Sequence, residues 1–339
     1  MKILVTGSAG FIGFHLAQRL LAEGYETVGL DNINDYYEVR LKHARLKETG
    51  IDESEIAYGR MLQSTRFANY RFVKLNLEDR PALESLFRDE RFDYVCNLAA
   101  QAGVRYSIEN PHTYIDSNIV GFINILECCR QCDVKHLIYA SSSSVYGNSE
   151  AVPFSEDDRV DYPVSLYAAS KKANELMAHA YSHLYRLPTT GLRFFTVYGP
   201  YGRPDMALFI FAKSIYEGKP VKVFNNGDLS RDFTYIDDII EGIVRVLWHI
   251  PSENNPHPYY QLFNIGHSQP VRLLDFIRTI ETALGKKAVL EMLPMQQGDV
   301  HTTFADTSGL ENAVNYKPKT DIQEGVGKFV AWWKKHYIL

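Results

Sequence analysis

A tyrosine and a lysine four positions apart carry the clearest chemical signal in this sequence. Tyr167 and Lys171 stand near the start of a helix-like stretch over 165–186. Residues four apart share one face of a helix, so both side chains point the same way. A phenol is a poor base at neutral pH, but a nearby cation favours the phenolate and lowers the pKa. The pair therefore predicts a general base, although the same spacing alone is also typical of packing on a helix surface.

A run of four serines upstream adds hydroxyl groups to this chemistry. The run occupies 141–144 and ends an apolar stretch over 135–141, which is typical of a buried strand. Ligands of open α/β sheets bind outside the carboxyl ends of the strands. We therefore expect the serines at the ligand-binding edge, with an ordinary polar turn as the alternative.

A glycine-rich turn follows the first apolar run and opens the first helical pattern. Gly7 permits a tight turn, Gly10 lets the backbone approach a pyrophosphate, and Gly13 lets the helix pack closely on the strand. The unpaired N–H groups at the helix N-terminus then face the anion. A glycine triplet alone is equally typical of a structural turn, so the surrounding residues must distinguish a phosphate-binding turn from a structural one.

Asp31 supplies that context. It ends the second apolar run, 18 positions after Gly13. There a carboxylate accepts hydrogen bonds from the ribose hydroxyls of adenosine and repels a 2′-phosphate, which favours NAD over NADP. The alternative for Asp31 is a turn residue at a strand end. Other residues expected near the dinucleotide are Asn76 and Leu77 after the third strand and Ala99, Ala100 and Gln101 after the fourth.

The elements that must position these groups alternate along the chain. Strand–helix–strand alternation predicts an α/β protein with a doubly wound parallel sheet of Rossmann type. We expect strands near 2–6, 26–30, 70–75, 93–98, 135–141 and 189–195, and helices near 12–23, 80–88, 112–131 and 165–186.

The domain organisation follows from where this alternation stops. We expect a Rossmann domain over 1–198, with a charged insertion at 34–68 that lacks a clear strand and is helical in part. Residues 199–339 are expected to form mainly a smaller α/β substrate-binding lobe, with some segments returning to the first domain. An amphipathic helix near 322–336 ends this lobe.

Composition excludes several classes. The net charge is -5 and the pI about 6.1, whereas binding to a nucleic-acid backbone needs a basic face. No apolar run reaches the roughly 18 residues of a membrane span, and no leader precedes the first strand, so we expect a cytoplasmic protein. Cys129-x-x-Cys132 resembles half a zinc site, but no second pair exists, so buried helix cysteines are the favoured interpretation and no metal is expected.

Together these motifs resemble the extended short-chain dehydrogenases/reductases, in the group of NAD-dependent nucleotide-sugar epimerases. The likeness covers nearly the whole chain. It rests on Thr6 to Gly13, Asp31, Ala99 to Arg105, Ser141 to Gly147, Tyr167 to Lys171, Arg193 to Tyr198, Arg231 to Asp238, and Gly298 with Asp299.

The resemblance implies a transient oxidation at C4 of a UDP-sugar with NAD as cofactor. Tyr167 is then the base, Lys171 its electrostatic partner, and Ser142 the hydroxyl beside the C4 oxygen. Further residues implied to contact NAD are Phe11, Ile12, Asn32, Ser141, Phe194 and Val197, besides those already named. Residues implied to contact the sugar nucleotide are Arg105, Ser142, Ser143, Ser144, Thr196, Arg203, Val223, Phe224, Arg231 and Asp299.

Two departures from the patterns of related enzymes narrow the set of reactions that the resemblance implies. Sugar dehydratases of this group carry an Asp-Glu pair where this chain has Ser143 and Ser144, and uronate decarboxylases carry a Glu in the same loop. Galactose-type epimerases usually have Asn at the place of Thr196. The segments 31–37 and 195–206 are most like UDP-glucuronate 4-epimerases.

A substrate carboxylate gives those residues a physical role. A buried carboxylate must be paired or hydrogen-bonded. Ser143, Ser144 and Thr196 offer hydroxyl groups, and Arg203 offers a charge-assisted donor. A surface arginine is the alternative for Arg203, and a structural salt bridge is the alternative for Arg105.

Rival functions remain open at this stage. One is an epimerase of UDP-glucose or UDP-N-acetylglucosamine, and another is a UDP-glucuronate decarboxylase. A third, of a different class, is a non-catalytic NAD-sensing protein, which would not need Tyr167 with Lys171. The resemblance also implies a homodimer that pairs the helices near 112–131 and 165–186.

Overall fold

The computed structural model describes residues 1–149, 151–295 and 301–338. These residues divide into two compact units. The first comprises Met1–Gly147, Arg159–Arg193 and Ile243–Phe263, and the second comprises Asn148–Asp158, Phe194–Gly242 and Asn264–Leu339. The second unit thus includes a segment that precedes residue 198, and the first includes a segment that follows it.

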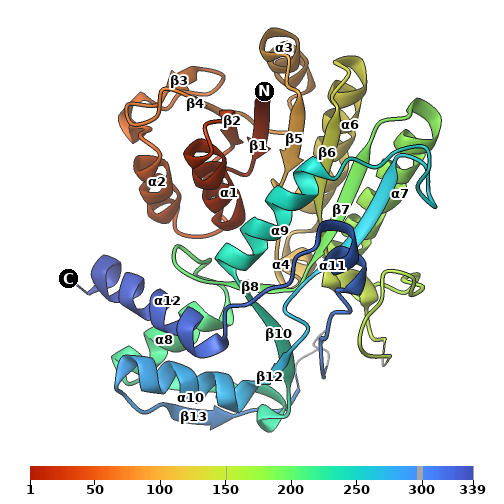
Figure 1. The fold of residues 1–339 in the computed structure, drawn as a ribbon. Helices are drawn as coiled ribbons and strands as arrows, with labels where there is room; N and C mark the ends of the chain where they lie inside the picture. Colours follow the sequence, from red (N-terminus) through yellow and green to blue (C-terminus); the bar gives the residue numbers. More distant parts are fainter. Residues whose placement is uncertain (150, 296–300, 339) are drawn as a thin grey trace. The chain divides into compact units, whose positions relative to one another are not determined.

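The first unit is built on a parallel sheet (Figure 1). The eight-stranded sheet has the order β11-β7-β6-β5-β1-β2-β4-β3, in which β1, β2, β4, β5 and β6 pair in parallel and β3 is antiparallel to β4. The strands are β1 Lys2–Thr6, β2 Glu26–Asp31, β3 Met61–Gln63, β4 Tyr70–Lys74, β5 Tyr94–Asn97, β6 His136–Ser142, β7 Thr189–Phe194 and β11 Tyr260–Ile265. The predicted doubly wound α/β fold is confirmed.

Helices cover both faces of this sheet. One apolar cluster joins side chains of α3, α6 and α7 to one face, and another joins α1 and α2 to the opposite face. Phe72 and Val73, adjacent in β4, enter different clusters because successive side chains of a strand point to opposite faces. The helices are α1 Phe11–Ala22, α2 Val39–Glu48, α3 Arg80–Glu90, α4 Tyr106–Glu109, α5 Pro111–Tyr114, α6 Gly121–Gln131 and α7 Leu166–Tyr185.

Two local features differ in detail from what the sequence predicted. The helix expected over 112–131 is interrupted by a π turn at Ile115–Val120. A π turn widens the helix, and here the backbone oxygen of Asn118 accepts a bond of 2.6 Å from Asn174. The insertion at 34–68 contains the short strand β3, of which only Leu62 is buried, so it leaves no periodic signal.

The order of the strands places the ligand-binding edge. The chain leaves β1 toward β2 and β4 on one side, and later occupies β5 and β6 on the other side. Loops at such a switch point diverge and open a crevice beyond the carboxyl ends of the strands. The glycine turn after β1 and the loop after β5 lie there.

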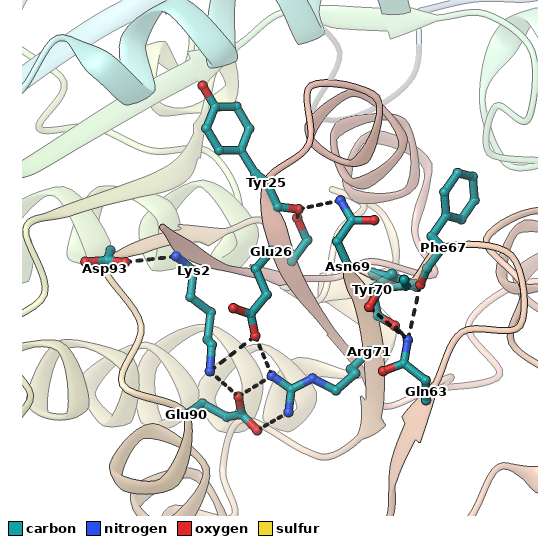
Figure 2. A network of polar contacts seen from close by, with 12 residues as sticks. Lys2, Tyr25, Glu26, Gln63, Phe67, Asn69, Tyr70, Arg71, Glu90 and Asp93 are labelled. Carbon is teal, nitrogen blue, oxygen red and sulfur yellow. Dashed lines mark hydrogen bonds and ion pairs between the residues drawn. The ribbon is translucent and has the colours of Figure 1, made fainter.

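Charged side chains tie the amino ends of the same strands (Figure 2). Lys2 Nζ lies 2.9 Å from Glu90 and 3.3 Å from Glu26, and Arg71 pairs with both carboxylates at 2.6 and 2.9 Å. These partly exposed pairs contribute modestly to stability. The pairs lie at the opposite end of the strands from the carboxyl edge, where a ligand is expected.

The second unit contains short strands and amphipathic helices. Strand β10 pairs in parallel with β8 and antiparallel with β12, and β9 pairs with β13. Its elements are β8 Thr196–Tyr198, β9 Pro220–Val223, β10 Ser230–Tyr235, β12 Pro270–Arg272, β13 Val289–Met292, α8 Ala207–Glu217, α10 Leu273–Leu284, α11 Ser308–Val314 and α12 Ile322–Tyr337, while α9 Ile236–Trp248 runs from this unit into the first. Within the described residues, no helix has both the length and the apolar character that crossing a membrane requires.

Candidate functional site

The glycine turn has the geometry that its sequence predicts. Gly7 adopts a φ of +72°, and a Cβ on Gly13 would lie 2.2 Å from the Gly7 oxygen. Gly10 is the N-cap of α1, so the first turn of this helix directs its N–H groups beyond β1. Phe11 and Ile12 begin the helix, and Phe11 is buried. Side chains at Gly7, Gly10 and Gly13 would collide with the backbone of the turn itself or of the loop after β5.

Asp31 is joined to the glycine turn. Its Oδ2 accepts a hydrogen bond of 3.1 Å from the Ala9 amide, and its Oδ1 accepts one of 2.8 Å from the Ile33 amide. The carboxylate is 6% exposed at the end of β2. These bonds fix its position beside the turn, where an adenosine ribose would meet it. Asn32 follows in the same loop and is half-buried.

The insertion contributes a residue that the sequence did not single out. Arg45 of α2 is fully buried, and its Nη1 donates to the Ala9 oxygen at 2.8 Å and to the Tyr37 hydroxyl at 2.6 Å. The turn is therefore held through the amide of Ala9 by Asp31 and through its carbonyl by Arg45. A lone arginine in a charged helix gives no signal of this contact, because its partner lies 36 positions away.

The loop after β5 lies against the same turn. A Cβ on Gly7 would lie 2.9 Å from the Ala99 nitrogen, so the two loops touch. Asn118 of the π turn accepts from the Gln101 amide at 2.8 Å and donates to the Gln101 oxygen at 3.0 Å. The Asn118 amide also lies 3.0 Å from Ser170 Oγ on α7. Asn118 thus links the expected cofactor loop to the helix that carries Tyr167.

The remaining expected cofactor contacts occupy the same edge or start the second unit. Asn76 is half-buried just after β4, and the Leu77 oxygen accepts a bond of 2.9 Å from Asn124. Phe194 and Val197 are each 8% exposed. These placements are compatible with the predicted contacts, which stay predictions.

Tyr167 and Lys171 lie on consecutive turns of α7, as predicted. Ser165 caps this helix by accepting from the Ala168 amide at 3.1 Å. The Tyr167 ring is half-buried and makes an edge contact with the Tyr114 ring, with centroids 6.0 Å apart. Lys171 is 4% exposed, and its Nζ donates to the Ala140 oxygen of β6 at 2.8 Å. Burial lowers the pKa of Lys171 to about 8.

The serines form a short 3-10 turn at the end of β6. Ser142 Oγ accepts from the Ser144 amide at 3.2 Å and donates to Ser144 Oγ at 3.1 Å. Ser142 is 8% exposed, while Ser143 and Ser144 are half-buried. Ser141 points elsewhere, because its Oγ donates to the buried Glu175 at 2.7 Å. Any contact of Ser141 with a cofactor would therefore come from its backbone.

The second unit brings together two of the residues expected at the sugar. Thr196 and Arg203 line one hollow, together with Tyr198, Met206, Phe233 and Phe329. Arg203 donates from Nε to Asp205 Oδ1 at 3.1 Å and from Nη2 to Oδ2 at 2.5 Å. Arg203 is thus held in the orientation in which a guanidinium meets a carboxylate in a bidentate pair.

The other described residues that we expected to contact the substrate do not line this hollow. Arg231 Nη1 donates to the backbone oxygens of Ser230 at 2.9 Å and His301 at 3.2 Å. Val223 is fully buried, and Phe224 begins a 3-10 turn rather than continuing the strand. Arg105 is exposed at the start of α4. Asp299 lies outside the described residues.

The possible metal ligands in the described parts of the chain include the cysteines of α6. Within them, no group of three or more His, Cys, Asp or Glu side chains is arranged to hold an ion. Cys128 and Cys129 are buried in α6, and burial raises the pKa of the Cys128 thiol to about 12. Such thiols are poor ligands and poor nucleophiles.

Comparison with known proteins identifies relatives across the whole chain. The model of the NAD dependent epimerase/dehydratase family matches residues 3–266. A probable UDP-glucuronate 4-epimerase of Rhizobium meliloti is 47% identical over 99% of this chain and 98% of its own. UDP-glucuronate 4-epimerase 4 of Arabidopsis thaliana is 44% identical over 99% of this chain and 76% of its own. The structure of UDP-glucuronic acid 4-epimerase from Bacillus cereus, in complex with UDP-glucuronic acid and NAD, matches with a TM-score of 0.87 at 33% identity, covering 99% of this chain and 100% of that one.

Proposed function

This chain belongs to the NAD-dependent epimerase/dehydratase family, and we propose that it interconverts UDP-glucuronate and UDP-galacturonate by inversion at C4. The observation that carries the proposal is its similarity, over nearly the full length, to relatives named for that reaction. The serine turn supports the proposal, because Ser143 and Ser144 occupy the positions at which the similar sugar dehydratases carry an Asp-Glu pair.

The residues at the carboxyl edge fit NAD. The glycine turn leads into the N-terminus of α1, whose N–H groups would bind a pyrophosphate, and Asp31 is fixed beside that turn. The same arrangement disfavours NADP, because a 2′-phosphate would meet the Asp31 carboxylate.

The chain's own groups perform the proton chemistry. Tyr167 takes the proton of the C4 hydroxyl and later returns it, while Ser142 hydrogen-bonds the C4 oxygen. Lys171 places a cation on the same helix face, which favours the phenolate of Tyr167. NAD, when bound, accepts the hydride of C4 and gives it back to the opposite face of the 4-keto sugar. Because no net oxidation occurs, the cofactor has no need to leave between turnovers.

The direct test is product analysis without added cofactor. Purified protein is incubated with UDP-glucuronate alone, and the product is followed by NMR. We expect UDP-galacturonate, formed by NAD that stays bound through purification. Conversion only of UDP-glucose or UDP-N-acetylglucosamine, release of a 4-ketopentose as the main product, or no turnover of any UDP-sugar would each assign one of the rival functions instead.

Cofactor choice gives a second expectation. Asp31→Ser removes the carboxylate that would bind the ribose hydroxyls, and one charge-assisted hydrogen bond contributes about 1.5–3 kcal/mol. We expect NAD to bind more weakly by about one to two powers of ten and the preference over NADP to shrink. Calorimetry with both dinucleotides measures this, with Asp89→Asn, at an exposed position of α3, as the control. Equal affinity of the wild-type chain for NAD and NADP would refute the role of Asp31.

We propose that the active form is a homodimer. Helix α7 exposes Leu176 and Leu184 at 60% and 65%, and the adjacent π turn exposes Ile115 and Val120 at 41% and 39%. Neighbouring exposed apolar side chains mark an interaction surface. A second copy that offers the same helices would cover them in an isologous contact.

The dimer proposal predicts a specific dissociation. Leu176→Glu places a charge within this face, so the chain is expected to become monomeric at micromolar concentration. Analytical ultracentrifugation measures the mass, with Leu290→Glu on β13, 40% exposed, as the matched control. A monomeric wild-type chain would contradict the proposal.

A cytoplasmic location is also part of the proposal. Cys96, Cys128, Cys129 and Cys132 are free thiols. Free cysteines are usual where the compartment is reducing.

A further inference from the structure

A buried ion pair lies beside the serine turn and has no part in the proton chemistry described above. Glu175 of α7 and Arg193 of β7 are each 1% exposed. Arg193 Nε donates to Glu175 Oε1 at 2.9 Å, and Nη2 donates to Oε2 at 3.0 Å. A fully desolvated bidentate pair is costly to form, so its presence at this place calls for a reason beyond stability.

The pair holds both ends of the serine turn. At one end, Ser141 Oγ donates to Glu175 Oε1 at 2.7 Å. At the other end, Arg193 Nη1 donates to the Tyr146 hydroxyl at 2.9 Å, with the guanidinium 4.8 Å from the centre of that ring. Ser142, Ser143 and Ser144 all lie between these two anchors in the sequence.

The same pair also connects this turn to the helix of the general base. Glu175 follows Tyr167 by eight positions and Lys171 by four, so the three residues share one face of α7. The neighbours Ala140 and Ser141 of β6 are bonded to Lys171 and Glu175, at 2.8 and 2.7 Å. Two successive residues of the strand are thus tied to two successive turns of the helix.

The charge state of Glu175 fits this role. Burial alone would raise the pKa of its carboxyl, but Arg193 and the hydrogen bond from Ser141 lower it, and the net result is a pKa below the ordinary value. The carboxylate is therefore ionised at neutral pH and accepts from both partners. Lys172 adds a contact of 3.3 Å to Oε2.

We propose that Glu175 and Arg193 are positioning residues, which bracket the serine turn and set its place relative to Tyr167. This inference rests on the proposed function, because it assumes that Tyr167 and Ser142 act on the same C4 oxygen. A displacement of a reacting group by about 1 Å can slow a reaction on the order of 10²-fold. Loosening the bracket should therefore slow the chemical step while leaving the fold and the cofactor in place.

The obvious variant, Glu175→Gln, leaves Arg193 buried with a neutral partner and can fail to fold. Two milder variants release one end of the bracket each and keep the ion pair: Ser141→Ala and Tyr146→Phe. We expect kcat to fall roughly tenfold in each variant, because releasing one end of the turn should displace the serines by less than the roughly 1 Å that slows a reaction on the order of 10²-fold. The dissociation constant of NAD and the KM of UDP-glucuronate should change less than about twofold.

Ser182→Ala is the matched control. Ser182 is 1% exposed near the other end of α7, and its Oγ donates to the Leu187 oxygen at 2.9 Å. Its Oγ also shares a hydrogen bond of 2.8 Å with Thr189 Oγ1, so Ser182→Ala loses two buried hydroxyl bonds. Its melting temperature should therefore fall at least as far as in the two test variants, while its kcat stays unchanged.

The results distinguish a positioning role of the Glu175–Arg193 pair from a purely structural role. Wild-type kcat in both Ser141→Ala and Tyr146→Phe overturns the proposal, and so does an equal loss of kcat in Ser182→Ala. A wild-type chain that converts no UDP-sugar refutes the proposed function instead, so the two failures are distinguishable.

Discussion

Tyr167→Phe is expected to lower kcat by about 10²–10⁴-fold, the usual effect of losing a general base. The change removes only the hydroxyl that takes the C4 proton. The ring keeps its edge contact with Tyr114, and Lys171 keeps its bond to the Ala140 oxygen. NAD should therefore remain bound. Turnover of UDP-glucuronate is measured by NMR, and bound cofactor by extraction and absorbance.

Tyr181→Phe controls for the loss of a tyrosine hydroxyl from the same helix. Its hydroxyl donates to Glu127 at 2.5 Å, on a different part of α7, and its loss should leave kcat unchanged. Near wild-type turnover in Tyr167→Phe would remove Tyr167 from the mechanism. Loss of bound NAD together with activity would mean that Tyr167 acts in cofactor binding rather than in proton transfer.

The sequence predicted the carboxyl ends of the strands well because local signals define them. The strands predicted over 2–6, 26–30 and 135–141 end within one residue of β1, β2 and β6, whose last residues are Thr6, Asp31 and Ser142. A parallel sheet then brings the carboxyl ends to one side. The spacing of Tyr167 and Lys171 on a helix needs no tertiary information either.

The supporting residues were missed because their partners are remote in sequence. Arg45 meets Ala9 across 36 positions, and Asn118 meets Ser170 across 52. A polar residue in a helix predicts solvent exposure, and only the packed structure reveals that these two are buried. Glu175 had a local signal, because it lies four positions after Lys171 on the same face, but its arginine partner has none.

Arg203→Ala is expected to weaken the binding of UDP-glucuronate by one to two powers of ten, because one charge-assisted bond contributes about 1.5–3 kcal/mol. Arg203 and Thr196 line one hollow, and a substrate carboxylate would share or replace the Asp205 carboxylate that now pairs with the guanidinium. UDP-glucose has no carboxylate, so its binding should change far less. Calorimetry with both sugar nucleotides measures the difference. Arg278→Ala, which removes a surface arginine paired with Asp275 on α10, is the control.

Thr196→Ala tests the predicted contact of Thr196 and Arg203 with the substrate carboxylate through the fate of the intermediate. Oxidation of C4 turns the uronate into a β-keto acid, which loses CO₂ when the bond from C5 to the carboxylate aligns with the π system of the ketone. The C5 carbanion then takes a proton and leaves a 4-ketopentose, with the hydride still on the cofactor. A hydroxyl and a guanidinium that hold the carboxylate near the carbonyl plane prevent that alignment, so Thr196→Ala should release more 4-ketopentose and NADH. Mass spectrometry of the products measures the partition. If Thr196→Ala forms no decarboxylated product and Arg203→Ala keeps wild-type affinity, other residues hold the carboxylate, and the preference for a uronate loses its physical basis in this hollow.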